Sequence, residues 1–416
     1  MKRYDEYKDS GVEWIGEVPR HWEVVRTRYL CNLCTGNKDT INRVDDGKFP
    51  FYVRSPKVER INTYSFDGEA ILMAGDGVGA GKVFHYANGK FDYHQRVYNF
   101  HNFKKVIGKF FYYYITNNFR YIIEEGGAKN TVDSVRLYMI QNFLITVPPK
   151  EEQREIVFYL EKKCSEIDNV ISAQQKRIAL LQELKQSVIT HAVTKGLNPN
   201  VEMKDSGVEW IGKIPASWDV VHLKRILRER MQYGANEPAE SDDTTYPRYI
   251  RITDITANGE LRPETFKSLE PSKAKDYLLD KGDVLFARSG ATVGKTFLFN
   301  ADIKACYAGY LIKASCDKRR MLPEYLYYYT QSGAYECWKN SVFIQSTIQN
   351  IGADKYQMMY IPVPSKDEQK QIVEYTMRKS QIFDAAISKA QHQVELLQEY
   401  KQSLITEVVT GKRKVS

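Results

Sequence analysis

Residues 148–196 read PPKEEQREIVFYLEKKCSEIDNVISAQQKRIALLQELKQSVITHAVTKG, and a second copy, VPSKDEQKQIVEYTMRKSQIFDAAISKAQHQVELLQEYKQSLITEVVTGK, runs over residues 363–412. Each stretch has proline at its start, Pro148 and Pro149 in the first copy and Pro364 in the second, and acidic residues follow within a few positions, as expected at a helix N-terminus. About 45 residues at 1.5 Å each make a helix of roughly 65 Å. Neither helix can bury its apolar side alone, so we expect the two to pair with each other.

Apolar or small residues recur in both copies at steps of three and four, which is typical of a coiled-coil seam rather than a broad globular face. The seam of the first copy contains Cys164, Ile167, Ile171, Ile178, Leu181, Leu184 and Val188, and that of the second contains Phe383, Ile387, Ala390, Val394, Leu397, Tyr400 and Leu404.

The opening of the chain is also repeated. KDSGVEWIGEVPRHWEVV (residues 8–25) returns as KDSGVEWIGKIPASWDVV (residues 204–221). The chain is therefore one unit of head, middle segment and helix, written twice. The heads and helices have retained high identity, whereas the middle segments have diverged, so we expect the middles to perform two versions of one task. The tryptophans of the heads either anchor a core or dock another protein.

We divide the chain into six segments: a head (1–22), a globular domain (23–147), a helix (148–197), a second head (198–218), a second globular domain (219–362) and a second helix (363–416). Each globular domain contains several strand-like runs and then an aromatic helix, and ends on a polar turn and a strand that leads into the long helix. The pattern predicts an α+β fold for both domains.

Composition sets broad limits on the function. At 416 residues the chain is long for one core, and its net charge of +8 permits nucleic-acid binding without establishing it. There is no run of eighteen apolar residues and no apolar signal core at the N-terminus, so we expect a cytoplasmic protein that does not enter a membrane. The pair Cys31 and Cys34 has no second CxxC beside it, which argues against a zinc site or a redox role.

Two glycine-rich stretches resemble phosphate loops. Gly75–Lys82 has the wrong glycine spacing, and Ser289–Thr296 has serine where the first glycine belongs. A phosphate loop must open a helix, but strand-like segments follow both stretches. We therefore expect a strand–loop–strand hairpin in each half, whose backbone and lysine could approach DNA. An enzyme that uses a nucleotide at Ser289–Thr296 remains a weaker alternative.

Signs of catalysis are missing from the sequence. The seven histidines show no paired-ligand spacing, and we find no nucleophile elbow, methyltransferase signature or nuclease carboxylate cluster. The sequence argues for a binding protein rather than an enzyme. A structural adaptor, with the helices as its functional part, is the rival class, and a strong salt dependence of DNA binding would separate the two.

The layout resembles the specificity subunit of type I restriction–modification systems. The similarity covers nearly the whole chain. It is strongest at the VP(P/S)K(E/D)EQ junctions that open the long helices, at the glycine loops, and at the aromatic helices, which contain the YYY runs at residues 112–114 and 327–329. The resemblance implies two target recognition domains, each reading one half of an interrupted DNA sequence, and helices that form an antiparallel spacer. It also implies two methyltransferase subunits that carry S-adenosylmethionine, ATP-dependent restriction subunits, and no catalytic residue in this chain.

No motif of the family marks the residues that read bases. We name as candidate contacts to double-stranded DNA the basic residues and polar turns of the two globular domains, namely Lys82, Arg96, Asn130, Thr131, Arg251, Arg288, Lys295, Ser346 and Thr347.

Overall fold

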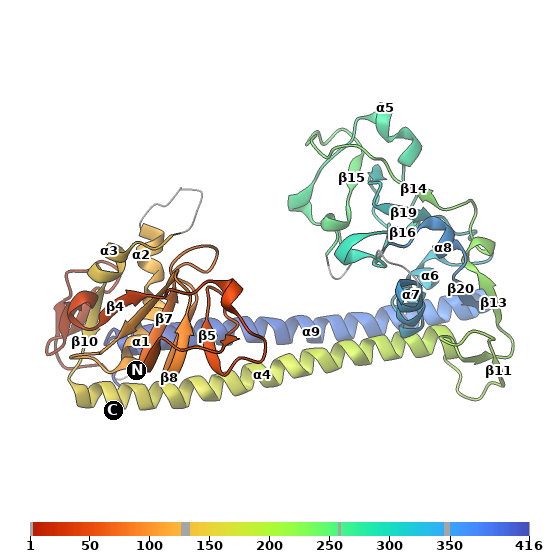
Figure 1. Ribbon diagram of the computed structural model, residues 1–416. Coiled ribbons are helices and arrows are strands. Elements are labelled where there is room, and N and C mark those ends of the chain that lie inside the picture. The colour runs from red at the N-terminus through yellow and green to blue at the C-terminus, as the bar shows by residue number, and fades with distance from the viewer. Residues whose placement is uncertain (1–2, 126–133, 257–258, 345–349, 416) are drawn as a thin grey trace. The chain divides into compact units, whose positions relative to one another are not determined.

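The computed structural model describes residues 3–125, 134–256, 259–344 and 350–415 (Figure 1). The chain divides into two compact units, which we describe separately: unit 1 contains residues 1–174 and 392–416, and unit 2 contains residues 175–391. The two long helices are α4 (Lys150–Lys195) and α9 (Lys366–Val409), close to the predicted ends. Each unit contains one globular domain and part of each long helix.

Unit 1 is built around a six-stranded sheet. Its elements are β1 (Tyr7–Asp9), β2 (Glu17–Pro19), β3 (Glu23–Arg26), β4 (Asn32–Thr35), β5 (Phe49–Tyr52), β6 (Glu59–Ile61), β7 (Phe66–Ala74), β8 (Phe84–Tyr93), β9 (Val97–His101), α1 (Gly108–Asn118), α2 (Arg120–Glu125), α3 (Leu137–Asn142) and β10 (Leu144–Val147). The strand order is β4-β9-β7-β8-β5-β6, and only the β5–β8 pair is parallel.

Helix α1 joins this sheet to the long helices of unit 1. Phe110 and Phe111 of α1 share one buried cluster with Ile71 of β7 and with Leu160 of α4. Burial of such aromatic side chains contributes about 1.5–3 kcal/mol each. The aromatic helix expected from the sequence therefore fixes the sheet on α4.

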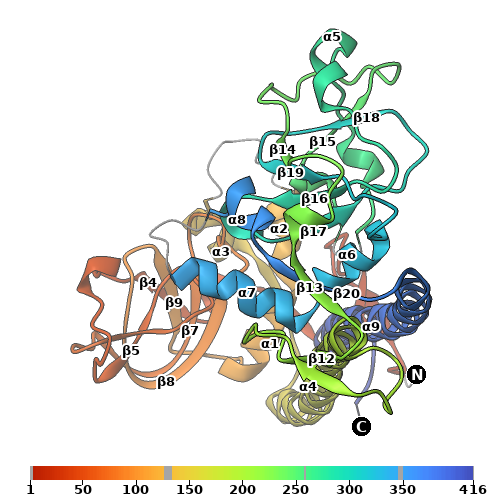
Figure 2. The same ribbon diagram turned by 90° about the vertical axis from the view of Figure 1, so that its right-hand side faces the viewer.

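Unit 2 repeats this plan with shorter strands. Its elements are β11 (Met203–Asp205), β12 (Lys213–Pro215), β13 (Asp219–His222), β14 (Gln232–Tyr233), β15 (Arg248–Ile250), α5 (Pro271–Ala274), β16 (Val284–Ala287), β17 (Thr296–Leu298), β18 (Ala305–Tyr307), β19 (Leu311–Ala314), α6 (Pro323–Tyr329), α7 (Gly333–Ile344), α8 (Ala353–Gln357) and β20 (Tyr360–Val363). Within the unit, the sheet β14-β19-β16-β17 lies between the β15–β18 pair and helices α6–α8 (Figures 1 and 2).

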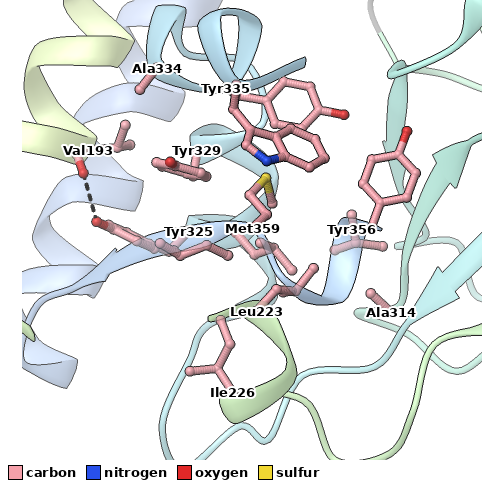
Figure 3. Close-up of a cluster of buried hydrophobic side chains, with 14 of the residues drawn as sticks. Val193, Leu223, Ile226, Ala314, Tyr325, Tyr329, Ala334, Tyr335, Tyr356 and Met359 are labelled. Atoms are coloured by element: carbon pink, nitrogen blue, oxygen red, sulfur yellow. Dashed lines mark hydrogen bonds between the residues drawn. The ribbon is translucent and has the colours of Figure 1, made fainter. Parts of the chain in front are cut away.

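The core of unit 2 is rich in tyrosine (Figure 3). Tyr325 and Tyr329 of α6 are fully buried, so their hydroxyl groups require partners inside the protein. The Tyr325 hydroxyl donates to the carbonyl oxygen of Val193 in α4 over 3.0 Å, and that of Tyr329 donates to the carbonyl of Tyr360 over 2.8 Å. The first bond ties the globular domain to the last turns of α4.

The heads lie at the ends of the long helices. In unit 1 the buried Trp22 donates from Nε1 to the carboxylate of Glu152 in the first turn of α4 (3.1 Å), and in unit 2 Trp218 does the same to Glu368 of α9 (3.2 Å). Strands β3 and β13, which leave the heads, pair with β10 and β20, which lead into the helices. For these two tryptophans the structure favours core anchoring.

The expected seam is buried in part. Ile167 and Ile171 are buried in unit 1 and Ile387 is buried in unit 2. Five other predicted seam residues are half-buried, namely Ile178, Leu181, Phe383, Val394 and Leu397.

Two further residues predicted for the seam do not lie in it. Leu184 and Tyr400 are 52% and 50% exposed. The next residue takes the inward place each time: Lys185 pairs with Asp384 in unit 2, and Lys401 pairs with Asp168 in unit 1, all at 2.7 Å. A step of four residues from Leu181 or Leu397 is as compatible with the helix as a step of three, so apolarity alone pointed to the wrong residue.

Candidate nucleic-acid interface

The glycine loop of unit 1 connects β7 to β8. These strands are antiparallel partners, so the expected strand–loop–strand hairpin is confirmed. Gly77 and Gly81 have φ of +71° and +63°, a region that side chains other than glycine disfavour. The amide of Gly81 donates to the carbonyl of Ala74, which closes the loop. Val78 stands at the tip with 92% of its surface exposed.

The predicted residues of the first domain gather beside this loop. Lys82 is exposed at its end, and the amide of Gly75 donates to the carbonyl of Arg96 over 2.8 Å. The guanidinium of Arg96 lies 3.6 Å from the carboxylate of Asp76. Asn130 and Thr131 lie outside the described residues, but Ser134, shortly after them, forms a β-bridge with Asp76. Lys82, Arg96 and Ser134 therefore lie around the same glycine loop; we call this region the recognition edge of the domain.

Unit 2 has the same arrangement. The hairpin β16–β17 is also antiparallel, and Gly290 and Gly294 have φ of +75° and +82°. Lys295 is exposed at the end of the loop. Ser346 and Thr347 lie outside the described residues, but Asn350 pairs with Ser289, and the amide of Ile351 donates to the carbonyl of Arg288.

Arg288 projects from the end of β16 at this edge. Its guanidinium lies over the ring of Tyr233, 4.9 Å from the ring centroid, which restrains the side chain by a cation–π contact. Its Nε is buried and finds no hydrogen-bond partner among the described residues. The aromatic support leaves an oriented guanidinium, which suits recognition of a planar acceptor edge.

Arg251 has a different environment from the other candidates. Its guanidinium forms an ion pair with the buried Asp254 at 2.7 Å and donates to the carbonyl of Thr265 over 2.9 Å. The hydrogen bond to Asp254 holds the pKa of this guanidinium above its usual range. Arg251 supports the fold at this position, and a role in DNA contact stays a prediction.

The sequence reasoning missed Arg54, which follows β5. Its Nη1 donates to the Asp76 carboxylate over 2.9 Å, beside a cavity of about 460 Å³. Nothing in the spacing of residues 54 and 76 indicates that they meet. The glycines are the one available signal, because a Cβ at Gly79 would come within 2.6 Å of the Arg54 carbonyl oxygen.

Within the described ranges, no three His, Cys, Asp or Glu side chains gather in a way that could hold a metal ion. Cys31 is buried, which raises the pKa of its thiol to about 12, whereas Cys34 is exposed and lies 3.2 Å from the Tyr93 hydroxyl. Among the helices that the structure describes, none is both long and apolar enough to cross a membrane.

Known proteins share this layout. The family model described as the type I restriction modification DNA specificity domain matches residues 19–180 and 215–395. The EcoDI specificity subunit of Escherichia coli is 21% identical over 375 residues, which cover 86% of this chain and 81% of that protein. The MjaVIII specificity subunit of Methanocaldococcus jannaschii is 23% identical over 419 residues, covering 96% and 94%.

A solved structure supports the fold. One chain of a structure described as addressing complex assembly and conformational transition of the type I R-M system has a TM-score of 0.68 to this chain. It is 17% identical, and the match covers 94% of this chain and 98% of that one. Because the family model matches both halves of the sequence, this chain belongs to the family of type I restriction–modification specificity subunits.

Proposed function

We propose that this chain selects the DNA target of a type I restriction–modification complex and performs no catalysis itself. Each globular domain would read one half of a bipartite sequence in double-stranded DNA. S-adenosylmethionine would be carried by two methyltransferase subunits, and cleavage would belong to separate ATP-dependent subunits. No feature of the described residues favours the structural adaptor over this proposal.

One observation carries the proposal: both globular domains have the same recognition edge around a glycine loop, although their sequences have diverged. Each unit combines a glycine loop, an exposed lysine at its end and a residue, Ser134 or Asn350, that forms a β-bridge with the loop. The first unit adds Arg96 at this edge and the second adds Arg288. Arginine and lysine supply contacts to phosphates and to the guanine edge. A constant frame with a variable edge is what two readers of different half-sites require.

The long helices would form a continuous antiparallel coiled coil that sets the distance between the half-sites. Support comes from side chains within each unit. Leu160 and Ile167 of α4 share a buried cluster with Leu404 of α9 in unit 1. The ion pairs Asp168–Lys401 and Lys185–Asp384 occupy equivalent places in the repeat. From the first ion pair to the second, the residue number rises along α4 and falls along α9, as it does along antiparallel helices.

The same helices would bind the methyltransferase subunits. Leu180 and Leu184 of unit 2 are 64% and 52% exposed, and they stand one helical turn apart. Their counterparts in unit 1, Leu396 and Tyr400, are each 50% exposed. Two equivalent exposed apolar pairs suit two copies of one partner, since large exposed apolar side chains in contiguous patches mark interaction sites.

The test is a reconstitution. The chain is purified alone and with its methyltransferase, and binding to a DNA library is measured at 50 and 200 mM salt. We expect weak binding by the chain alone, specific binding by the complex, and a steep loss of affinity with salt. Methylation by the chain without a partner, or binding that salt leaves unchanged, contradicts the proposal.

A further inference from the structure

Arg54 and Asp76 form a charged pair on the recognition edge of unit 1. Arg54 Nη1 donates to Asp76 Oδ1 over 2.9 Å, and Arg96 Nε lies 3.6 Å from the other carboxylate oxygen. The Asp76 side chain is 20% exposed and that of Arg54 is 44% exposed. The acid is therefore held between two guanidinium groups, with Arg54 the more accessible member of its hydrogen-bonded pair.

The backbone around Arg54 is fixed on two sides. Gly79 packs so closely that a Cβ there would come within 2.6 Å of the Arg54 carbonyl oxygen. On the other side, Nε2 of His85 in β8 lies 3.1 Å from the carbonyl oxygen of Ser55. These contacts place the main chain, and the hydrogen bond from Nη1 to Asp76 orients the guanidinium. Within the described residues, its Nε and Nη2 have no hydrogen-bond partner.

The surroundings of Arg54 favour a base over a phosphate. The Asp76 carboxylate would repel a phosphate that approached the same guanidinium, whereas the guanine edge carries no charge. Guanine presents O6 and N7 as paired acceptors in the major groove, which match two parallel N–H donors of arginine. Val78 projects 92% exposed beside the same cavity, so the loop tip presents an apolar side chain to an approaching groove.

We propose that Arg54 reads a guanine in the half-site of the first recognition domain, with Asp76 as its positioning residue. The assignment rests on the proposed function, because it takes unit 1 to be a DNA reader. It adds a specificity-determining residue that was not among the sequence candidates.

The test uses the full chain, co-expressed with its methyltransferase in a host without methylation of its own, and maps methylated sites across the genome. Arg54→Ala, Arg54→Lys and Asp76→Ala are compared with the unchanged chain. Lysine keeps the charge but lacks the planar fork. Lys90→Ala is the control, because Lys90 is an exposed residue of β8 that lies over Tyr64.

We expect both Arg54 variants to relax the preference for guanine at one position of one half-site, by about 5- to 150-fold, with the second half-site unchanged. Asp76→Ala should relax the same position, which a purely structural role would not single out. Lys90→Ala should retain the motif of the unchanged chain.

Three results would overturn the assignment. A motif that all Arg54 and Asp76 variants retain removes Arg54 as a reader. A uniform loss of methylation at all sites by Arg54→Ala, which Arg54→Lys does not share, indicates a phosphate contact, provided that both variants unfold like the unchanged chain. An unchanged chain that yields no bipartite motif with its partner overturns the proposed function and this assignment together.

Discussion

The ammonium group of Lys185 in α4 lies 2.7 Å from both carboxylate oxygens of Asp384 in α9. In the other unit, Lys401 of α9 stands at the same distance from both oxygens of Asp168 in α4. Lys185 corresponds to Lys401 in the repeat, and Asp384 corresponds to Asp168. Each half of the sequence thus contributes the lysine of one ion pair and the aspartate of the other. The two subunits of a symmetric dimer share their contacts in the same way.

The Lys185–Asp384 pair should stabilise the fold by a measurable amount. Its side chains are 27% and 33% exposed, so solvent screens the attraction in part. A double-mutant cycle with Lys185→Met and Asp384→Asn should give a coupling energy of about 0.5–1 kcal/mol from urea unfolding. The exposed pair Lys163–Glu166 within α4 is the control and should give a smaller coupling energy, because solvent screens it more strongly. Equal coupling in both cycles would show that the pair between helices adds nothing to a local one.

The exposed apolar pairs on the helices should determine how many methyltransferases bind. Leu180→Lys with Leu184→Lys should reduce the complex from two bound methyltransferases to one. Adding Leu396→Lys and Tyr400→Lys should leave none. Mass photometry of the assembled complex measures the count.

The control for this prediction is Phe158→Lys. Phe158 is 72% exposed on α4, but its counterpart in α9 is Glu374, so it lacks the symmetry of a site used twice. All of these residues are at least half exposed, so unfolding should change by no more than about 0.5 kcal/mol per substitution. Two methyltransferases bound to the fourfold variant would contradict the docking proposal.

Residues 1–203 should form a dimer of identical chains. The fragment contains both Asp168 and Lys185, so two antiparallel copies can form the ion pair twice. The two helix copies differ at Leu184/Tyr400 and at Cys164/Ser380. The first difference is exposed and lies outside the seam, whereas Cys164 and Ser380 are both buried. Light scattering should give twice the mass of one fragment. Lys185→Glu, which would face Asp168 of the second copy, should weaken the dimer. A folded monomer would refute this pairing.

The sequence was most informative where a repeat or a period constrained it. The long helices, both glycine hairpins and the α+β class follow from local pattern, because a 3.6-residue period and a strand–glycine–strand order are properties of neighbouring residues. Asn32–Thr35 and Glu59–Ile61, which form β4 and β6, are short edge strands of the sheet and carry little alternation. The sequence therefore gave no comparable signal for them.

The candidate site was predicted less completely than the fold. Lys82, Arg96, Arg288 and Lys295 were found because they adjoin glycine loops. Arg54 was not, because it meets Asp76 only through the packing of β5 beside β8. Arg251 looked free in the sequence, and only the tertiary structure shows that its guanidinium is bound to Asp254.

The two long helices should act as a ruler. Inserting seven residues in register into both helices, near Gln174 and Ala390, lengthens each by roughly 10 Å. At 3.4 Å per step this corresponds to about three base pairs. The lengthened chain should methylate targets whose half-sites are correspondingly further apart, as genome-wide methylation mapping would show. A gap preference that stays the same would contradict the spacer role.

The central claim is that two independent readers share one chain, and a domain exchange tests it most directly. Residues 23–147 are replaced with the matching segment of another specificity subunit, and methylated sites are mapped with the methyltransferase present. We predict a bipartite motif in which one half changes and the other half keeps every base. A motif altered in both halves, or in neither, would contradict the claim.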